Sequence, residues 1–456
     1  MDEKSKTSGL MMYPCHPWHP FDPQVLDYCG GHGPHLHVNS FDDWKIENNS
    51  WKESCYIFAG LNVTPTGCIS GPDAIRLLSD CTCNSHARFP VGRIKHDVMT
   101  DENGLILMHG LSLRVAEDKV WLSTTYPWVV NVALKGGYDV KCEDTSQSDF
   151  NLQCAGPRVL EALENATQED LHDISFMGFR DSSILGKPVR IMRMGMGGTL
   201  SYEVHGDSQF APGIYSAVLE AGKPVGMKRI GWRAYMSNHT ENGYPQENFH
   251  FPSVCREHPD VMEGLAKQGY NIHIWPGQVN CKGSSGTDLS KRYRNPIELG
   301  WDISVGFDHD FPGKEALKAL KANPVRRTAT LIWNPEDILD VAASRYNKDE
   351  APYKEIPCPV TTSGNAGMEQ DDVYDSEGNL IGSSTGLVYT MFSRETISLG
   401  VLDVKFCEPG SQVNILWGEP GTRQKTIRAA VAKFPRLALT PNSKFDVETI
   451  PHFQKK

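Results

Sequence analysis

The sequence predicts an α+β fold that ends in a C-terminal β-barrel domain, and two observations carry this prediction. A short apolar strand, a Gly-Pro pair and an amphipathic helix occur together at residues 69–78 and again at 153–163, each followed by hairpin-rich sequence. Beyond a polar loop at 324–327 the chain is mostly strand-like. Duplicated units with helix-backed antiparallel sheets are typical of α+β proteins, and a run of short strands closes readily as a small barrel.

Each repeated unit has the same local design. The strand ends at a glycine, Gly71 or Gly156, and proline takes the first helical position, where its missing N–H costs nothing. After the first unit we expect strands at 96–99, 105–109, 111–116 and 120–124, with turns at 101–104 and 117–118. After the second we expect strands at 188–194 and 200–205, then a helix capped by Ser208 that ends at Gly222. A looser third copy covers 311–320.

The C-terminal part is expected to contain strands at 328–333, 381–389, 396–404 and 413–417. The acidic, weakly apolar residues 367–378 are expected to form a surface loop. We therefore predict three parts: a His-, Pro- and Gly-rich segment at 1–43, a central domain at 44–324 and a barrel domain at 325–456.

Composition limits the classes of function. The 456 residues are 39% hydrophobic and 22% charged, as in ordinary soluble proteins, and a net charge of −11 argues against nucleic-acid binding. No apolar run approaches the length that spans a bilayer, and the start resembles no secretory signal, so we expect a cytoplasmic protein without a membrane partner. The 12 cysteines include no C-x-x-C pair and are expected to be free thiols. Cys81 and Cys83 alone are too few for a zinc site.

One carboxylate stands out. Residues 195–206 read as a strand, a glycine turn and a second strand whose acid is Glu203. A lone carboxylate on a mid-domain strand is costly without a partner. That partner is either a ligand with adjacent N–H donors or a cation such as Arg233, whose guanidinium forms bidentate pairs. A structural Glu203–Arg233 ion pair therefore stays open beside a ligand site.

Together with residues 69–74, 136–140, 219–223, 295–300, 307–311 and 416–419, this segment resembles the aminomethyltransferase family, typified by the T-protein of the glycine cleavage system. Over about 44–434 the chain is most similar to the tetrahydrofolate-dependent O-demethylases of methoxylated aromatic acids, the vanillate and syringate demethylase group. The resemblance implies a folate-binding central domain, a C-terminal barrel and tetrahydrofolate as cofactor.

The resemblance also implies site residues. Gln153 and Glu203 take the folate-contacting positions, Glu203 as the pterin-binding carboxylate. Tyr244 stands where the demethylases usually place a tryptophan that stacks on the cofactor, and Arg233 is placed to fix Glu203 or polar groups of the cofactor. The alternative for Gln153 is an edge-strand side chain that bonds backbone.

Tyr235 is the catalytic candidate. Cleaving an aryl methyl ether releases a phenolate, and a tyrosine, with a pKa near 10, suits general-acid work on that oxygen. The implied reaction moves a methyl group to tetrahydrofolate and gives a phenol and 5-methyltetrahydrofolate. The alternative is a core tyrosine with a bonded hydroxyl.

Two departures from the family pattern narrow the substrate. Residues 121–138 contain no acid, whereas the T-protein uses an aspartate there, so aminomethyl transfer from a lipoyl carrier protein is not expected. The demethylases' substrate-binding arginine is also missing from 123–128. Arg93, Arg292 and the N-terminal histidines, His16 and His19 among them, are the candidates to bind substrate instead.

The N-terminal histidines allow a second interpretation. His35 and His37 share a strand face and are conceivable metal ligands, but the family chemistry is metal-free, so no metal is expected and the segment is interpreted as lining the substrate pocket. Two other functions stay open: tetrahydrofolate-dependent transfer of a methylene or an N- or S-methyl group, and non-enzymatic folate binding. The motif of the non-enzymatic relative, Lys-Gly-Cys-Tyr, is not matched by residues 281–285.

Overall fold

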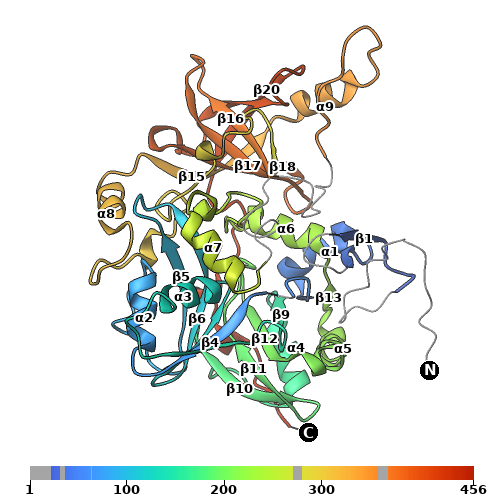
Figure 1. Cartoon of the computed structure of the whole chain (residues 1–456). Helices are drawn as coiled ribbons and strands as arrows, with labels where there is room; N and C mark the ends of the chain where they lie inside the picture. The colour runs from blue at the N-terminus through green and yellow to red at the C-terminus, as the bar shows by residue number, and fades with distance from the viewer. Residues whose placement is uncertain (1–21, 31–35, 63, 271–279, 358–367, 456) are drawn as a thin grey trace, which may run out of the picture.

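The computed structural model describes residues 22–30, 36–62, 64–270, 280–357 and 368–455. These residues form a helix-backed pair of sheets at one end of the molecule and a β-barrel at the other, drawn in orange and red in Figure 1. The predicted α+β class with a C-terminal barrel is confirmed.

A six-stranded sheet contains the second repeated unit. Its order is β10 (Phe179–Ile184), β11 (Lys187–Met192), β12 (Ser201–Asp207), β9 (Asp149–Ala155), β3 (Tyr56–Phe58) and β13 (Lys228–Arg229). One face packs on α4 (Val159–Thr167) and α5 (Ala211–Gly222) through an apolar core that includes Leu152 and Val204. Burial of this face leaves the opposite face available for polar side chains, because successive residues of a strand alternate between faces.

A five-stranded sheet contains the first repeated unit. Its order is β5 (Ile94–Thr100), β6 (Ile106–Ala116), β7 (Lys119–Ser123), β4 (Thr66–Ser70) and β8 (Lys141–Asp144). The two strands expected at 105–109 and 111–116 are one continuous strand, β6. A two-stranded sheet, β1 (Asp27–Gly30) with β2 (Leu36–Ser40), lies at the N-terminal side.

The remaining helices differ in burial: residues 74–81 are buried along one face, whereas residues 232–241 are buried on nearly all sides. They are α1 (Trp44–Glu53), α2 (Ala74–Cys81), α3 (Tyr126–Ala133), α6 (Trp232–Glu241), α7 (Pro259–Lys267), α8 (Lys314–Ala322) and α9 (Pro335–Ser344). Short 3-10 turns occur at Ser208–Phe210, Lys223–Val225, Val254–Glu257, Leu289–Lys291, Asp302–Ser304, Val404–Phe406, Asn442–Lys444 and Val447–Thr449. The cap expected at Ser208 is supplied one residue earlier, by Asp207, whose side chain accepts from the Gln209 amide. Among the described helices, none has the length and apolar character needed to cross a bilayer.

The barrel closes through six antiparallel strands. Their order is β16 (Met368–Tyr374), β17 (Leu380–Thr390), β18 (Glu395–Asp403), β15 (Arg326–Trp333), β20 (Lys425–Ala432) and β19 (Gln412–Trp417), and β19 pairs back onto β16. A short strand before the barrel, β14 (Cys281–Lys282), pairs in parallel with β16.

The expectation of a surface loop at 367–378 is wrong for most of that segment, because β16 runs through it. Its acidic side chains have partners from distant parts of the chain. The backbone N–H of Ser284 donates to buried Asp371 at 3.0 Å, and Lys354 pairs with Glu369 at 2.5 Å. These contacts satisfy carboxylates that would otherwise be costly to place on a barrel strand.

The chain does not stay in the barrel after β20. It returns to the six-stranded sheet, where the side-chain amide of Asn442 donates to the Ser201 carbonyl at the start of β12 at 2.8 Å. Val447 and Ile450 then join the core formed by that sheet, α4 and α5. The domain limits proposed at 43/44 and 324/325 stay a prediction.

Candidate active site

The site begins with the polar face of the six-stranded sheet. Asn151 and Gln153 lie two positions apart on β9, and Glu203 and His205 lie two positions apart on β12, so each pair shares one face of its strand. The antiparallel register places Glu203 opposite Gln153 and His205 opposite Asn151. Directly opposed residues point to the same face, so these four side chains form one polar patch.

The Glu203 carboxylate is the centre of this patch. It is 3% exposed and accepts three hydrogen bonds. The Gln153 amide donates to Oε1 at 2.9 Å, while Asn151 at 3.0 Å and His205 Nε2 at 2.9 Å bond to Oε2. The partners of the lone carboxylate are therefore side chains on its own strand and on the next one.

The five-stranded sheet borders this polar patch. The indole of Trp121, on β7, lies edge-on to the His205 ring at a centroid distance of 5.1 Å. Its Nε1 donates to Asp149 at 2.8 Å, at the start of β9. The patch thus lies where the two sheets meet.

Arg233 does not contact Glu203. It lies on α6, and its Nη2 is 3.3 Å from the Asp27 carboxylate on β1. The Glu203–Arg233 ion pair left open by the sequence is not formed, and the guanidinium instead ties the N-terminal hairpin to α6. A cofactor contact by Arg233 stays a prediction.

The patch also contains hydrogen-bond acceptors that have no partner among the described residues. The side-chain oxygens of Gln153 and Asn151 are buried and have no hydrogen-bond partner among the described residues. Buried acceptors without partners are costly and are typical of ligand sites. A pterin presents an amino group and a ring N–H side by side, so this set of oxygens, with Glu203, fits tetrahydrofolate.

Tyr235 packs against this patch from α6. It is 2% exposed, and its ring stacks on Phe58 of β3 at a centroid distance of 4.1 Å and an interplanar angle of 16°. Phe58 is the strand partner of Gln153. Burial, reinforced by Tyr56 and Glu203, raises the pKa of Tyr235 well above its ordinary value. The phenol therefore stays protonated and can donate a hydrogen bond, while its catalytic role stays a prediction.

His239 was not singled out by the sequence, but it lies one helical turn beyond Tyr235 with ring centroids 4.9 Å apart. Its Nδ1 donates to the Tyr244 carbonyl oxygen at 2.8 Å, which leaves Nε2 as an acceptor. That Nε2 is buried without a partner among the described residues. Burial lowers the pKa of His239 to about 3, so the imidazole is neutral.

Tyr244 belongs to an aromatic cluster between the five-stranded sheet and the segment that follows α6. Its hydroxyl is 3.2 Å from His96 Nε2, which is 3.2 Å from His109 Nδ1. The Trp301 ring lies 5.7 Å from Tyr244 and 4.9 Å from each histidine ring. Burial lowers the pKa of His96 to about 3 and that of His109 to about 4, so this wall is uncharged. No motif in the sequence signals these histidines.

The predicted substrate residues have mixed outcomes. His16 and His19 lie outside the described residues. Arg93 donates to the Ser175 hydroxyl at 2.5 Å and to the Phe176 carbonyl at 2.9 Å, and so is held by a neighbouring loop. Buried Arg292 donates to backbone carbonyls of 282, 286 and 368. A substrate contact by any of them stays a prediction.

Comparison with known proteins assigns a family to this geometry. A family model described as the GCVT N-terminal domain matches residues 38–248. The chain is 39% identical to sesamin methylene transferase of a Sinomonas strain, over 88% of this chain and 90% of that protein. It is 28% identical to syringate O-demethylase of a Sphingobium strain, over 89% of this chain and 92% of that protein.

A solved structure shows the same fold. The glycine cleavage system aminomethyltransferase T of Bartonella henselae superposes with a TM-score of 0.65, over 91% of this chain and 95% of that one, at 16% sequence identity. At this identity the likeness establishes the architecture alone, including the C-terminal barrel.

Proposed function

The chain belongs to the tetrahydrofolate-dependent aminomethyltransferase family, and from that premise we propose that it moves a one-carbon unit from the ether oxygen of a neutral aromatic compound to tetrahydrofolate. The first donor is a methylenedioxyphenyl ring, which gives a catechol and 5,10-methylenetetrahydrofolate. The second is an aryl methyl ether, which gives a phenol and 5-methyltetrahydrofolate. The relative named for sesamin methylene transfer, at 39% identity, supports the first, and the syringate O-demethylase relative, at 28%, supports the second.

The observation that carries the choice of a neutral substrate is the uncharged wall beside Tyr235. Burial holds His96, His109 and His239 neutral. Arg93 and Arg233 are engaged by protein oxygens. A substrate carboxylate taken into this region would be desolvated without a cation among the described residues, which is costly. A neutral ether avoids that cost.

The reaction balances in either case. Methyl transfer breaks one C–O bond, and the freed oxygen gains the proton that the acceptor nitrogen loses. Transfer of a methylene bridge breaks two C–O bonds, so two oxygens each gain a proton. Hydrogen-bond donors at the leaving oxygen therefore matter more for the methylene donor.

The residues of the site have separate roles in this proposal. Glu203, with the free oxygens of Gln153 and Asn151, holds the pterin through its N–H groups. Tetrahydrofolate, when bound, supplies the nucleophilic nitrogen that accepts the carbon. Tyr235 donates a hydrogen bond to the leaving oxygen as negative charge develops there, from a site that excludes water. Fixing donor and acceptor together supplies a further part of the rate.

A matched substrate panel tests the proposal. The purified protein is incubated with tetrahydrofolate and, in separate reactions, a 1,2-methylenedioxybenzene, the corresponding methoxybenzene, and each of these with an added benzoate carboxylate. We expect a catechol or phenol, with the folate product, from the neutral members, and slower turnover of the acids. A strong preference for the acids would contradict the argument from the uncharged wall. Folate binding without turnover of any aromatic ether would favour a non-enzymatic folate-binding protein.

A further inference from the structure

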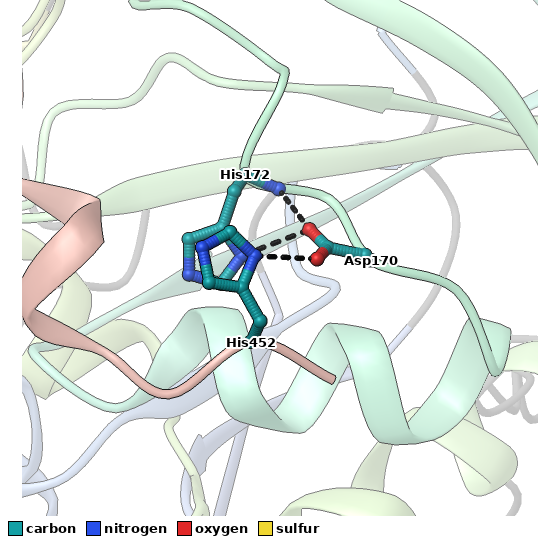
Figure 2. A group of neighbouring side chains, drawn as sticks. All are labelled: Asp170, His172 and His452. Carbon is teal, nitrogen blue, oxygen red and sulfur yellow. Dashed lines mark hydrogen bonds and ion pairs between the residues drawn. The ribbon is translucent and has the colours of Figure 1, made fainter. Parts of the chain in front are cut away.

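A second group of ligating side chains lies on the far side of the α4 core, away from Tyr235 and Glu203. Figure 2 shows Asp170, His172 and His452, with both imidazoles directed at the Asp170 carboxylate. His172 Nδ1 is 3.0 Å from Oδ1, and His452 Nδ1 is 2.5 Å from Oδ2. One ligand atom from each of the three residues lies within 4.8 Å of the other two.

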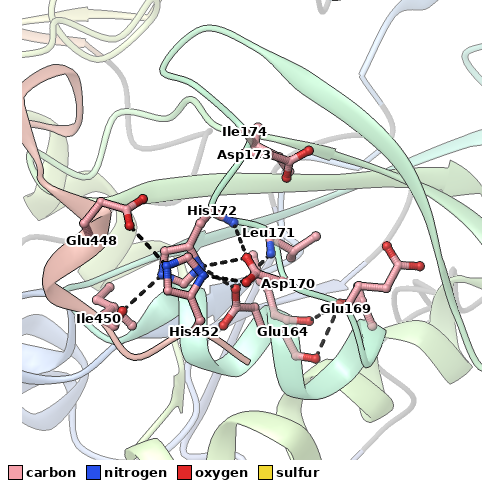
Figure 3. A network of polar contacts seen from close by, with 12 residues as sticks. Glu164, Glu169, Asp170, Leu171, His172, Asp173, Ile174, Glu448, Ile450 and His452 are labelled. Carbon is pink, nitrogen blue, oxygen red and sulfur yellow. Dashed lines mark hydrogen bonds and ion pairs between the residues drawn. The ribbon is translucent and has the colours of Figure 1, made fainter. Parts of the chain in front are cut away.

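The Nε2 atoms of both histidines, which face away from Asp170, already have hydrogen-bond partners. His172 Nε2 is 3.1 Å from the Ile450 carbonyl oxygen, and His452 Nε2 is 3.1 Å from the Glu448 carboxylate (Figure 3). A carbonyl can only accept, so Nε2 of His172 donates this hydrogen bond, and Nδ1 is the nitrogen that faces Asp170. Histidines that bind metals almost always donate their other N–H to a backbone carbonyl or a carboxylate, and the two histidines here show one of each.

Glu164 supplies a further oxygen. It lies on α4, is 2% exposed, and its Oε1 is 2.9 Å from His172 Nδ1. The Leu171 N–H holds that oxygen in place at 2.8 Å. Two imidazole nitrogens and the Asp170 carboxylate therefore lie close together, a set of donors that suits zinc, and Glu164 contacts His172 beside them.

Access and charge favour a cation at this point. A cavity of about 370 Å³ adjoins the cluster and is lined by residues 161, 164, 165, 168 and 451–454. The two imidazole rings stack with centroids 3.9 Å apart and an interplanar angle of 21°. One ion bound by both Nδ1 atoms has to lie near the plane of each ring, so binding requires this stack to open.

We propose that His172 Nδ1, His452 Nδ1 and the Asp170 carboxylate form a Zn²⁺ site, with the Glu164 carboxylate beside it. Zinc–ligand bonds of about 2.0–2.2 Å place tetrahedral ligand atoms about 3.3–3.6 Å apart. The two Nδ1–oxygen pairs, now 3.0 and 2.5 Å apart, must therefore open by roughly 0.3–1 Å when the ion binds. The ion would join the loop after α4 to the returning C-terminal segment, so its role is structural. This site is independent of the folate site.

Zinc binding by the full-length protein, stripped with a chelator, tests the site. We expect elemental analysis and calorimetry to find one more equivalent in the wild type than in His452→Ala, whose side chain is exposed. We expect Co²⁺ to give the absorption of a tetrahedral site only in the wild type. Glu448→Gln should weaken binding by about 10-fold, as expected for the partner of a ligand.

His258→Ala is the matched control, because His258 forms a histidine–carboxylate pair with Asp101 at 3.3 Å outside the cluster. We expect it to bind as much zinc as the wild type. Equal zinc uptake by the wild type and His452→Ala would overturn the proposal and leave a network held by protons alone. The comparison with His452→Ala also separates this site from any zinc bound by the N-terminal histidines.

Discussion

Replacing Tyr235 by phenylalanine removes only the hydroxyl group and so measures its contribution. The stacking on Phe58 at 4.1 Å and the edge contact with His239 at 4.9 Å involve the ring, so both are retained. The variant loses the hydrogen bond between the hydroxyl and the Gln153 side chain, which is worth about 1 kcal/mol of stability. If the hydroxyl stabilises the leaving oxygen, turnover falls by about 10²–10⁴-fold, or about 2.7–5.4 kcal/mol of activation free energy.

The raised pKa of Tyr235 sharpens this expectation. A phenol that is a weaker acid than the leaving group keeps its proton and stabilises the oxygen by hydrogen bonding. The defect of Tyr235→Phe should therefore fall on kcat rather than KM, and should shrink for donors whose product phenol is more acidic. Steady-state kinetics over a series of ring-substituted donors measures both effects.

Tyr202→Phe is the matched control, because Tyr202 lies on β12 beside Glu203 and faces the apolar core, on the opposite side of the sheet. We expect it to turn over at nearly the wild-type rate. A Tyr235→Phe enzyme with normal kcat on the poorest leaving group would refute the reasoning and return Tyr235 to a packing role.

Three further outcomes are expected. Glu203→Gln should weaken tetrahydrofolate binding by about 10- to 150-fold in calorimetry, since a hydrogen bond to a charged group is worth about 1.5–3 kcal/mol. Glutamine is chosen because alanine would leave three buried donors without a partner. Unchanged affinity would contradict the proposed folate site. The folded-state pKa values of His96 and His109, about 3 and 4, lie below the ordinary 6.5, so the unfolded chain binds more protons between these values. Stability should therefore fall as pH drops from about 6.5 towards 4 in urea titrations, and asparagine at both positions should flatten that slope. Gly156→Ala should cost about 2–4 kcal/mol in denaturation, because φ is +134° and the added Cβ would lie 2.3 Å from a backbone oxygen, whereas Gly92→Ala, with φ +87° and open space, should cost about 1 kcal/mol.

Much of the fold follows from local pattern. The Gly-Pro units at Gly71 and Gly156 and the apolar strands of the barrel depend on residues close in sequence, so their spacing predicts them. Strand β16 could not be found in this way. Its carboxylates Asp371 and Glu369 read as solvent-exposed, because their partners Ser284 and Lys354 come from elsewhere in the chain.

Some residues of the candidate site can likewise be predicted from the sequence, and others cannot. The resemblance pointed to Gln153 and Glu203, and strand alternation then adds Asn151 and His205, two residues away on the same faces. The free Nε2 of His239 has no such signal, because it depends on a carbonyl beyond the end of α6. Asp170 and His452 are 282 residues apart, so no spacing rule brings them together.

The return of the chain from the barrel has a consequence for biosynthesis. Val447 and Ile450 complete the apolar core beneath the strands that carry Gln153 and Glu203. While a nascent chain still lacks these residues, that core stays open to water on one side, even though every strand of its sheet has already been made. The strands that carry Gln153 and Glu203 therefore reach their final stability only late in translation, and chains interrupted in or just after the barrel present apolar surface to chaperones and proteases.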